Sequence, residues 1–142
     1  MGAETPLRVF CDANILFSAS KPRSAIRRLV QALLKRKAAV TSRYAIAEAE
    51  ANLRAKKPDW LPHWPMLRRR FQVHDVRAEI RVRGLPEKDL PIAQAAMSAT
   101  ATHLLTGDRK HFGSLMGKSV RDVKVVSPRM LVTELDALGW TV

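Results

Sequence analysis

The stretch Arg8-Val9-Phe10-Cys11-Asp12-Ala13-Asn14-Ile15-Leu16 decides the fold of this 142-residue chain. Its apolar, strand-forming run ends abruptly at Asp12, and Asn14 follows two positions later. Buried parallel strands are near-continuous apolar runs, and open α/β sheets bind ligands at the carboxyl ends of their strands. We therefore expect Asp12 at such an edge. A plainer role also fits these residues, because Asp and Asn often shape turns and cap helices.

Helix and strand patterns alternate along the rest of the chain. The predicted elements are a helix beginning at Ser24 and ending near Lys35, a strand at 38–41, a helix capped by Ser42 that runs to about Arg54, a strand at 73–76, a helix at 86–100, strands at 103–106 and 124–126, and a helix at 128–138. This alternation predicts an α/β fold with three α/β/α layers around a mostly parallel sheet. We find no repeats or linker, so we expect one domain spanning 1–142.

The segment 56–65 is the least regular part of the chain, because three prolines interrupt it. We expect a loop there, with at most one short helical turn before 66–71. Trp60 and Trp64 stand beside basic residues and could stack unpaired bases. Aromatic side chains at this spacing more often pack into the core, and we favour that interpretation for both.

Composition indicates a folded, strongly basic protein. Apolar residues make up 46% of the chain, and 25 Lys and Arg against 13 Asp and Glu give a formal net charge of +12. Such an excess attracts polyanions through their phosphates. The one cysteine, Cys11, allows no internal disulfide and is most simply a buried hydrophobic residue. Neither a signal peptide nor a membrane-spanning run is present, so we expect a cytoplasmic protein without membrane contact.

Further acids are placed to meet Asp12 at the sheet edge. Asp108 ends the strand at 103–106 as Asp12 ends the first, and Asp89 opens a helix, where it could also be a simple capping acid. Glu48 and Glu50 lie about 200° apart on their helix, so only one can face the edge, and the apolar pattern does not say which. Clustered carboxylates repel one another unless a cation lies between them. Oxygen ligands of this kind suit Mg²⁺ or Mn²⁺, and such ions activate water for phosphodiester cleavage.

These pieces together resemble the PIN-domain nucleases. The matching motifs are Asp12-Ala13-Asn14-Ile15-Leu16, Ser42-x-Tyr44 leading to Glu48 and Leu53, Lys88-Asp89-Leu90-Pro91 before an Ala-rich helix, Leu104-Leu105-Thr106-Gly107-Asp108, and Val125-Val126-Ser127-Pro128 before the last helix. Each motif alone is weak. The resemblance nevertheless spans nearly the whole chain, and the motifs stand in the family's order and spacing.

The resemblance implies a metal-dependent endoribonuclease that cuts single-stranded or loop RNA, most often as the toxin of a toxin–antitoxin pair. The catalytic and metal-binding acids would be Asp12, Glu48, Asp89 and Asp108, with Mg²⁺ or Mn²⁺ as the cofactor. The family's pattern thus favours Glu48 over Glu50. Asn14 would orient Asp12, and Thr106 would support Asp108. Partners implied in the same way are RNA, an antitoxin protein and a second copy in a homodimer.

The chain also departs from the family pattern. Ala13 stands where many members carry Thr or Ser, and Lys110 and His111 follow Asp108 where some members place another acid. We therefore expect one firmly bound ion. Our candidates for contacting the RNA backbone are Arg23, Arg43, Arg109 and Lys110.

Two other classes of function remain open at this point. A non-catalytic RNA- or protein-binding module could use the same fold, although the presence of all four acids argues against a decayed site. A phosphatase with an aspartyl nucleophile also places an Asp after its first strand. That chemistry needs a second Asp two residues later, and this chain has Asn14.

Overall fold

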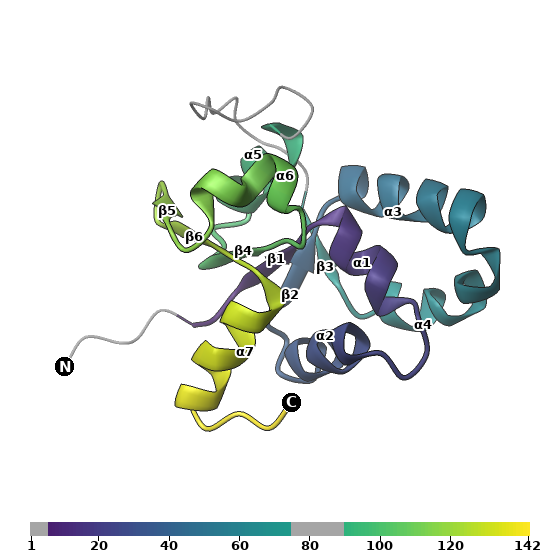
Figure 1. Cartoon of the computed structure of the whole chain (residues 1–142), viewed down its shortest axis with the longest axis horizontal. Coiled ribbons are helices and arrows are strands. Elements are labelled where there is room, and N and C mark those ends of the chain that lie inside the picture. Colours follow the sequence, from purple (N-terminus) through teal and green to yellow (C-terminus); the bar gives the residue numbers. More distant parts are fainter. Residues whose placement is uncertain (1–5, 75–89) are drawn as a thin grey trace.

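A mostly parallel sheet lies between two layers of helices in the computed structural model, which describes residues 6–74 and 90–142 (Figure 1). The strands are β1 (Val9–Cys11), β2 (Ala39–Thr41), β3 (Gln72–Val73), β4 (His103–Leu105), β5 (Ser119–Val120) and β6 (Val123–Val126). Their spatial order is β3-β2-β1-β4-β6-β5, and every pairing is parallel except that of β5 with β6. The predicted three-layer α/β fold is confirmed.

The strand order reverses direction beside the central strand β1. From β1 the chain moves through β2 to β3 at one edge, then returns to place β4 on the other side of β1. Loops that leave β1 and β4 in opposite directions open a crevice at the carboxyl ends of these strands, which is where α/β sheets bind ligands. Asp12 follows β1 directly, and Asp108 follows β4.

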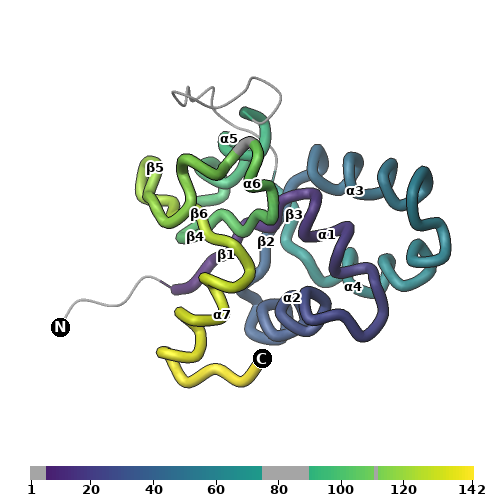
Figure 2. Tube along the Cα trace, viewed as in Figure 1, coloured from purple at the N-terminus to yellow at the C-terminus, as the bar shows by residue number. Residues whose placement is uncertain are grey.

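Helices cover both faces of this sheet. They are α1 (Ala13–Ala19), α2 (Ala25–Lys35), α3 (Arg43–Lys56), α4 (Pro65–Arg68), α5 (Leu90–Ser98), α6 (Arg109–Phe112) and α7 (Pro128–Ala137), with 3₁₀ helices η1 (Pro58–His63) and η3 (Gly113–Leu115). Helix α1 packs against both α2 and α3 on one face, whereas α5 and α6 lie on the other. Figure 2 shows α1 beside α3 along the chain trace. None of the helices in the described ranges is long and apolar enough to span a membrane.

Serine caps fix the predicted helix starts. The Ser24 hydroxyl accepts a hydrogen bond from the Arg27 amide at the start of α2. Ser42 does the same for α3 through the amide of Ala45. Such caps satisfy amide groups that a helix start leaves without partners. The predicted helices at 24–35, 43–54 and 128–138 are therefore confirmed within one or two residues at each end.

Several features of the described residues differ from the sequence-based prediction. The short helices α1 and α6 and the strand β5 were not expected. Strand β3 was predicted at 73–76 and lies at 72–73, and residues 75 and 76 fall outside the described ranges. Strand β5 pairs with β6 through a two-residue turn at Arg121 and Asp122, whose φ angles are 48° and 70°. Tight hairpin turns of this kind usually carry Asn-Gly or Asp-Gly, and their absence removed the signal.

The irregular segment is more helical than predicted. Pro58 begins η1, and Pro65 begins α4. Proline is tolerated at a helix start because the N–H it lacks would have no partner there. Trp64 is 1% exposed, and its indole N–H donates to the Glu50 carboxylate at 2.9 Å, so the core interpretation is confirmed for this residue. Trp60 is only partly buried.

The first strand is buried throughout, as its apolar run predicted. Val9, Phe10 and Cys11 are each 0% exposed. Burial, followed by the nearby charge of Asp12, raises the pKa of the Cys11 thiol far above its usual range. A thiol held neutral in this way is inert as a nucleophile. Cys11 is thus a small core residue that helps to hold Asp12 at the end of the strand.

Candidate active site

Asp12 lies at the crevice between β1 and β4, where the sequence predicts an active edge. The two strands pair with Cys11 opposite Leu105, and the Asp12 amide donates to the Leu105 carbonyl at 3.0 Å. The Asp12 side chain is 5% exposed. The sheet therefore fixes the backbone of this acid before its side chain makes any contact.

Three donors hold the Asp12 carboxylate in one orientation. Its Oδ1 accepts from the Ala13 amide at 2.7 Å, which caps α1. Its Oδ2 accepts from the Thr106 hydroxyl at 2.8 Å and from the Asn14 side-chain amide at 3.2 Å. The plainer role predicted for Asp12, helix capping, is therefore real, and it occurs together with a place in the cavity.

Asn14 and Thr106 link the end of β1 to the loop after β4. The Asn14 side-chain oxygen accepts from the Gly107 amide at 2.9 Å, and its amide group lies 3.3 Å from the Thr106 hydroxyl. The same hydroxyl accepts from the backbone amide of Asp108 at 3.1 Å. One buried hydroxyl therefore donates to one acid and positions the backbone of another. This network sets the spacing of the two loops across the crevice.

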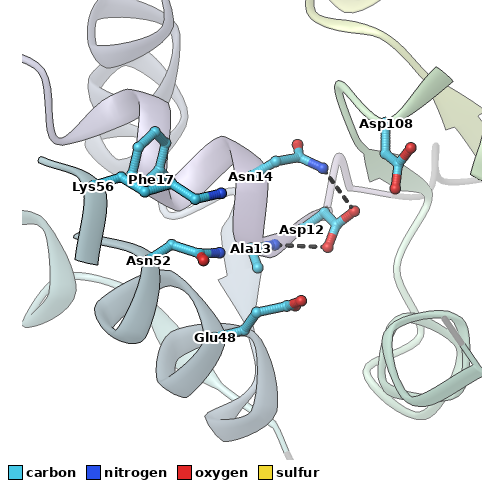
Figure 3. Close-up of a pocket in the computed structure, with 8 residues that line it drawn as sticks. All are labelled: Asp12, Ala13, Asn14, Phe17, Glu48, Asn52, Lys56 and Asp108. Atoms are coloured by element: carbon cyan, nitrogen blue, oxygen red, sulfur yellow. Dashed lines mark hydrogen bonds between the residues drawn. The ribbon is translucent and has the colours of Figure 1, made fainter. Parts of the chain in front are cut away.

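A polar cavity of about 230 Å³ opens beside this network (Figure 3). Its lining comes from the β1 edge, α1, α3 and the loop after β4, and comprises Asp12, Ala13, Asn14, Phe17, Glu48, Asn52, Lys56 and Asp108. Glu48 faces the cavity from α3. Glu50 instead accepts hydrogen bonds from Trp64 and Arg68 at 2.9 and 3.1 Å. Three of the four predicted acids, Asp12, Glu48 and Asp108, therefore line one cavity. Glu50, the alternative to Glu48 on α3, does not.

The charge state of Asp12 reflects this environment. Burial raises its pKa from the ordinary 3.8 to about 6, against the lowering effect of the hydrogen bonds from Thr106 and Ala13. The negative charges of Glu48 and Asp108 also contribute to this raised pKa. A carboxylate that is costly to ionise beside two other acids is stabilised by a cation, which would offset both the burial and the repulsion.

Sequence reasoning missed three residues of the lining, Phe17, Asn52 and Lys56. Helical spacing could have identified them once the acids were chosen. Residues Asn52 and Lys56 lie four and eight positions after Glu48, on the same face of α3. Phe17 lies three positions after Asn14 on α1. The cavity is the space between these two helix faces.

Of the other predicted residues, those that the structure describes do not line this cavity. Asp89 lies outside the described residues. Arg23, Arg109 and Lys110 are exposed at loop or helix-start positions, and Arg43 borders a separate hollow with Arg68 and Arg69. The side chain of His111 also lies outside what the structure describes. RNA contacts by the four basic residues stay a prediction.

The carboxylate oxygens that the structure describes are the type of ligand that a hard cation prefers, but their positions do not form a complete coordination site. Within residues 6–74 and 90–142, no three His, Cys, Asp or Glu side chains come close enough to form a complete metal site. Asp12, Glu48 and Asp108 nevertheless supply oxygen donors from three elements around one cavity. Donors of this type suit Mg²⁺ or Mn²⁺, which commonly keep several waters and need only a few protein ligands.

Comparisons with known proteins establish the fold. No family model matches the sequence, and no curated protein matches it. Among solved structures, PAE2754 from Pyrobaculum aerophilum is similar at a TM-score of 0.65 and 21% identity, covering 92% of this chain and 96% of its own. VapBC2 from Rickettsia felis, bound to a DNA fragment from its promoter, is similar at a TM-score of 0.61 and 16% identity, and the match covers 85% of this chain and 98% of its own. The predicted PIN-like three-layer α/β/α fold is thus confirmed.

Proposed function

We propose that this chain is a metal-dependent endoribonuclease that hydrolyses phosphodiester bonds of single-stranded or loop RNA. One observation carries the proposal. Asp12, Glu48 and Asp108 leave three different elements and line one cavity at the crevice where the strand order reverses. A buried acid with two acids around it is a costly arrangement in a stable fold, and such arrangements are typical of functional sites.

Asp12, Glu48 and Asp108 would hold the cation, and Asp89 remains a further candidate by resemblance. When bound, Mg²⁺ or Mn²⁺ would stabilise the charge that develops on the phosphate and make water a better nucleophile. The protein's own contribution is orientation. Thr106 and Asn14 fix the Asp12 carboxylate, so its ligand oxygen needs no rearrangement on binding.

The basic surface would deliver the substrate to this acidic cavity. The chain carries a formal net charge of +12, which attracts RNA over distances of about a Debye length, ~8 Å at physiological salt. Lys56 brings one of these positive charges into the cavity lining itself. The basic surface would thus attract the RNA, and the acids of the cavity would carry out its cleavage.

The toxin role is a narrower part of the same proposal. It rests on the motif resemblance and on the structural likeness to VapBC2 from Rickettsia felis. An antitoxin would be a protein that binds this chain and stops cleavage. A homodimer is expected from the resemblance alone. Co-purification of this chain with the product of an adjacent reading frame, and loss of cleavage in the complex, would support the toxin role.

Cleavage of a labelled pool of single-stranded RNA tests the nuclease itself. We expect cutting with Mn²⁺ or Mg²⁺, none with EDTA, and none by the Asp12→Asn protein. The matched control is Asp136→Asn, which removes the same charge from an exposed position of α7. RNA retained without cutting would favour the alternative, a non-catalytic binding module. Full activity of Asp12→Asn would rule the proposed site out.

A further inference from the structure

The cavity changes character along its length. Figure 3 shows Asp108, Asp12 and Glu48 toward one end and Phe17 with Lys56 toward the other. On α3, Glu48 and Lys56 are eight residues apart, which is about 12 Å along the helix. The acidic end suits a cation, whereas the far end offers an aromatic ring and an ammonium group. The far end is not explained by metal binding.

An aromatic pair continues from that far end onto the surface. The ring of Phe17 packs against Trp60 of η1, with ring centroids 5.3 Å apart and planes tilted by 53°. Both rings are partly buried, so each keeps some accessible area. Trp64, only four residues later, is buried in the core. The core interpretation is therefore confirmed for Trp64, whereas Trp60 packs against the core with part of its ring still accessible.

Three lysines surround this aromatic pair. The Nζ atoms of Lys57 and Lys21 lie 5.2 and 6.0 Å from the centroid of the Trp60 ring. Both lysines are exposed, and Lys56 lines the cavity beside Phe17. The Trp60 ring is partly accessible and both lysines are exposed, so these cation–π contacts are weak. A base that stacks on the ring can displace the ammonium groups and leave them to pair with phosphates.

We infer that Phe17 and Trp60, with Lys21, Lys56 and Lys57, form a stacking platform for the RNA bases next to the cleaved bond. Single-stranded nucleic acid is bound by aromatic side chains under the bases and basic side chains along the backbone. The platform meets both requirements, and it is continuous with the acid-lined cavity through Phe17 and Lys56. This inference rests on the proposed function, because it assigns the nucleotides that flank the same site.

Equilibrium binding in EDTA tests the platform without cleavage. The probe is a fluorescein-labelled oligoadenylate of eight nucleotides, compared with an oligomer of equal length and charge whose central bases are removed. The variants are Trp60→Leu and Phe17→Leu. The control is Trp140→Leu, which removes a ring that also carries a cation, since Arg36 lies 4.1 Å from its centroid. Arg36 follows α2 and precedes the amino end of β2. Trp140 therefore lies near the amino ends of the strands, away from the crevice at their carboxyl ends.

We expect Trp60→Leu and Phe17→Leu each to weaken binding of the intact oligomer at least about fivefold, the lower end of what one base–aromatic stack contributes. Binding of the oligomer without central bases should change less than twofold, and Trp140→Leu should leave both affinities unchanged. Trp60→Phe keeps a ring and should retain most of the affinity. If Trp60→Leu does not fold, Phe17→Leu decides the matter, because it also removes a ring of the platform.

The platform is wrong if the intact oligomer binds equally well to every variant, in which case this surface is better explained as a protein contact. It is also wrong if both oligomers lose affinity by the same factor, because phosphate attraction alone would then be involved. Parallel cleavage assays separate this result from the proposed function. Metal-dependent cutting with unaltered binding by Trp60→Leu would overturn the platform alone. Base-dependent binding without any cutting would overturn the nuclease alone.

Discussion

Replacing Asp12 by Asn should stabilise the metal-free protein at neutral pH. Burial and the charges of Glu48 and Asp108 raise the pKa of Asp12 from 3.8 to about 6. Each unit of pKa corresponds to about 1.4 kcal/mol, so keeping Asp12 ionised in the folded state costs on the order of 3 kcal/mol at pH 7. A neutral Asn side chain avoids that cost.

The substitution also loses hydrogen bonds. The Asn amide nitrogen is a donor only, so it accepts from neither Thr106 nor Asn14, and each lost bond costs about 1 kcal/mol. We therefore expect Asp12→Asn to be about 1 kcal/mol more stable than the wild type at pH 7. Below pH 4 the wild-type Asp12 is itself protonated, and the variant should be the less stable of the two.

The pH dependence is the sharper test of this reasoning. Because the folded pKa lies above the unfolded one, the contribution of Asp12 to stability is greatest below pH 3.8 and is lost as pH rises through about 6. Urea unfolding in EDTA at pH values from 4 to 7.5 measures the difference between variant and wild type. We expect that difference to change by roughly 2.5 kcal/mol in favour of the variant. A difference that stays constant over this range would refute the electrostatic account.

Other predictions concern Asp12, the groups around it and the buried Trp64. Mn²⁺ affinity, measured by calorimetry, should fall as pH drops through about 6, because the ion must displace a proton from Asp12. Thr106→Val should reduce cleavage at least about tenfold and lower stability by about 2 kcal/mol, since it removes the hydroxyl that donates to Asp12 and accepts from the Asp108 amide. Glu48→Gln should lower the pKa of Asp12 in a carbon-13 NMR titration of the carboxyl group, because the charge of Glu48 raises it. Trp64→Phe should cost about 1–3 kcal/mol in urea unfolding, through the lost hydrogen bond to Glu50 and the space left in the core.

Much of the fold could be predicted because its signals are local. The apolar run before Asp12, the capping serines Ser24 and Ser42 and the alternation of helix and strand each act over a few residues. Features without a local signal were missed. Helix α1 has only seven residues, and its cap, Asp12, also suited a site at the strand edge. The turn at 121–122 lacks glycine.

The candidate site was predictable in its acids but not in its extent. Asp12 and Asp108 end strands, which is visible in the sequence, whereas the choice of Glu48 over Glu50 depended on a family resemblance. The structure supplies a physical reason for that choice, because Glu50 is engaged by Trp64 and Arg68. Phe17 was missed because its role depends on how α1 packs against α3, a contact between segments distant in sequence.

The most direct test of the central claim compares Glu48→Gln with Glu50→Gln in Mn²⁺-dependent cleavage of single-stranded RNA. Both variants remove one negative charge from α3, two residues apart, and only Glu48 lines the cavity. We predict that Glu48→Gln loses cleavage while Glu50→Gln, confirmed as folded by thermal unfolding, retains it. Full cleavage by Glu48→Gln would contradict the claim that these acids form one metal-dependent active site.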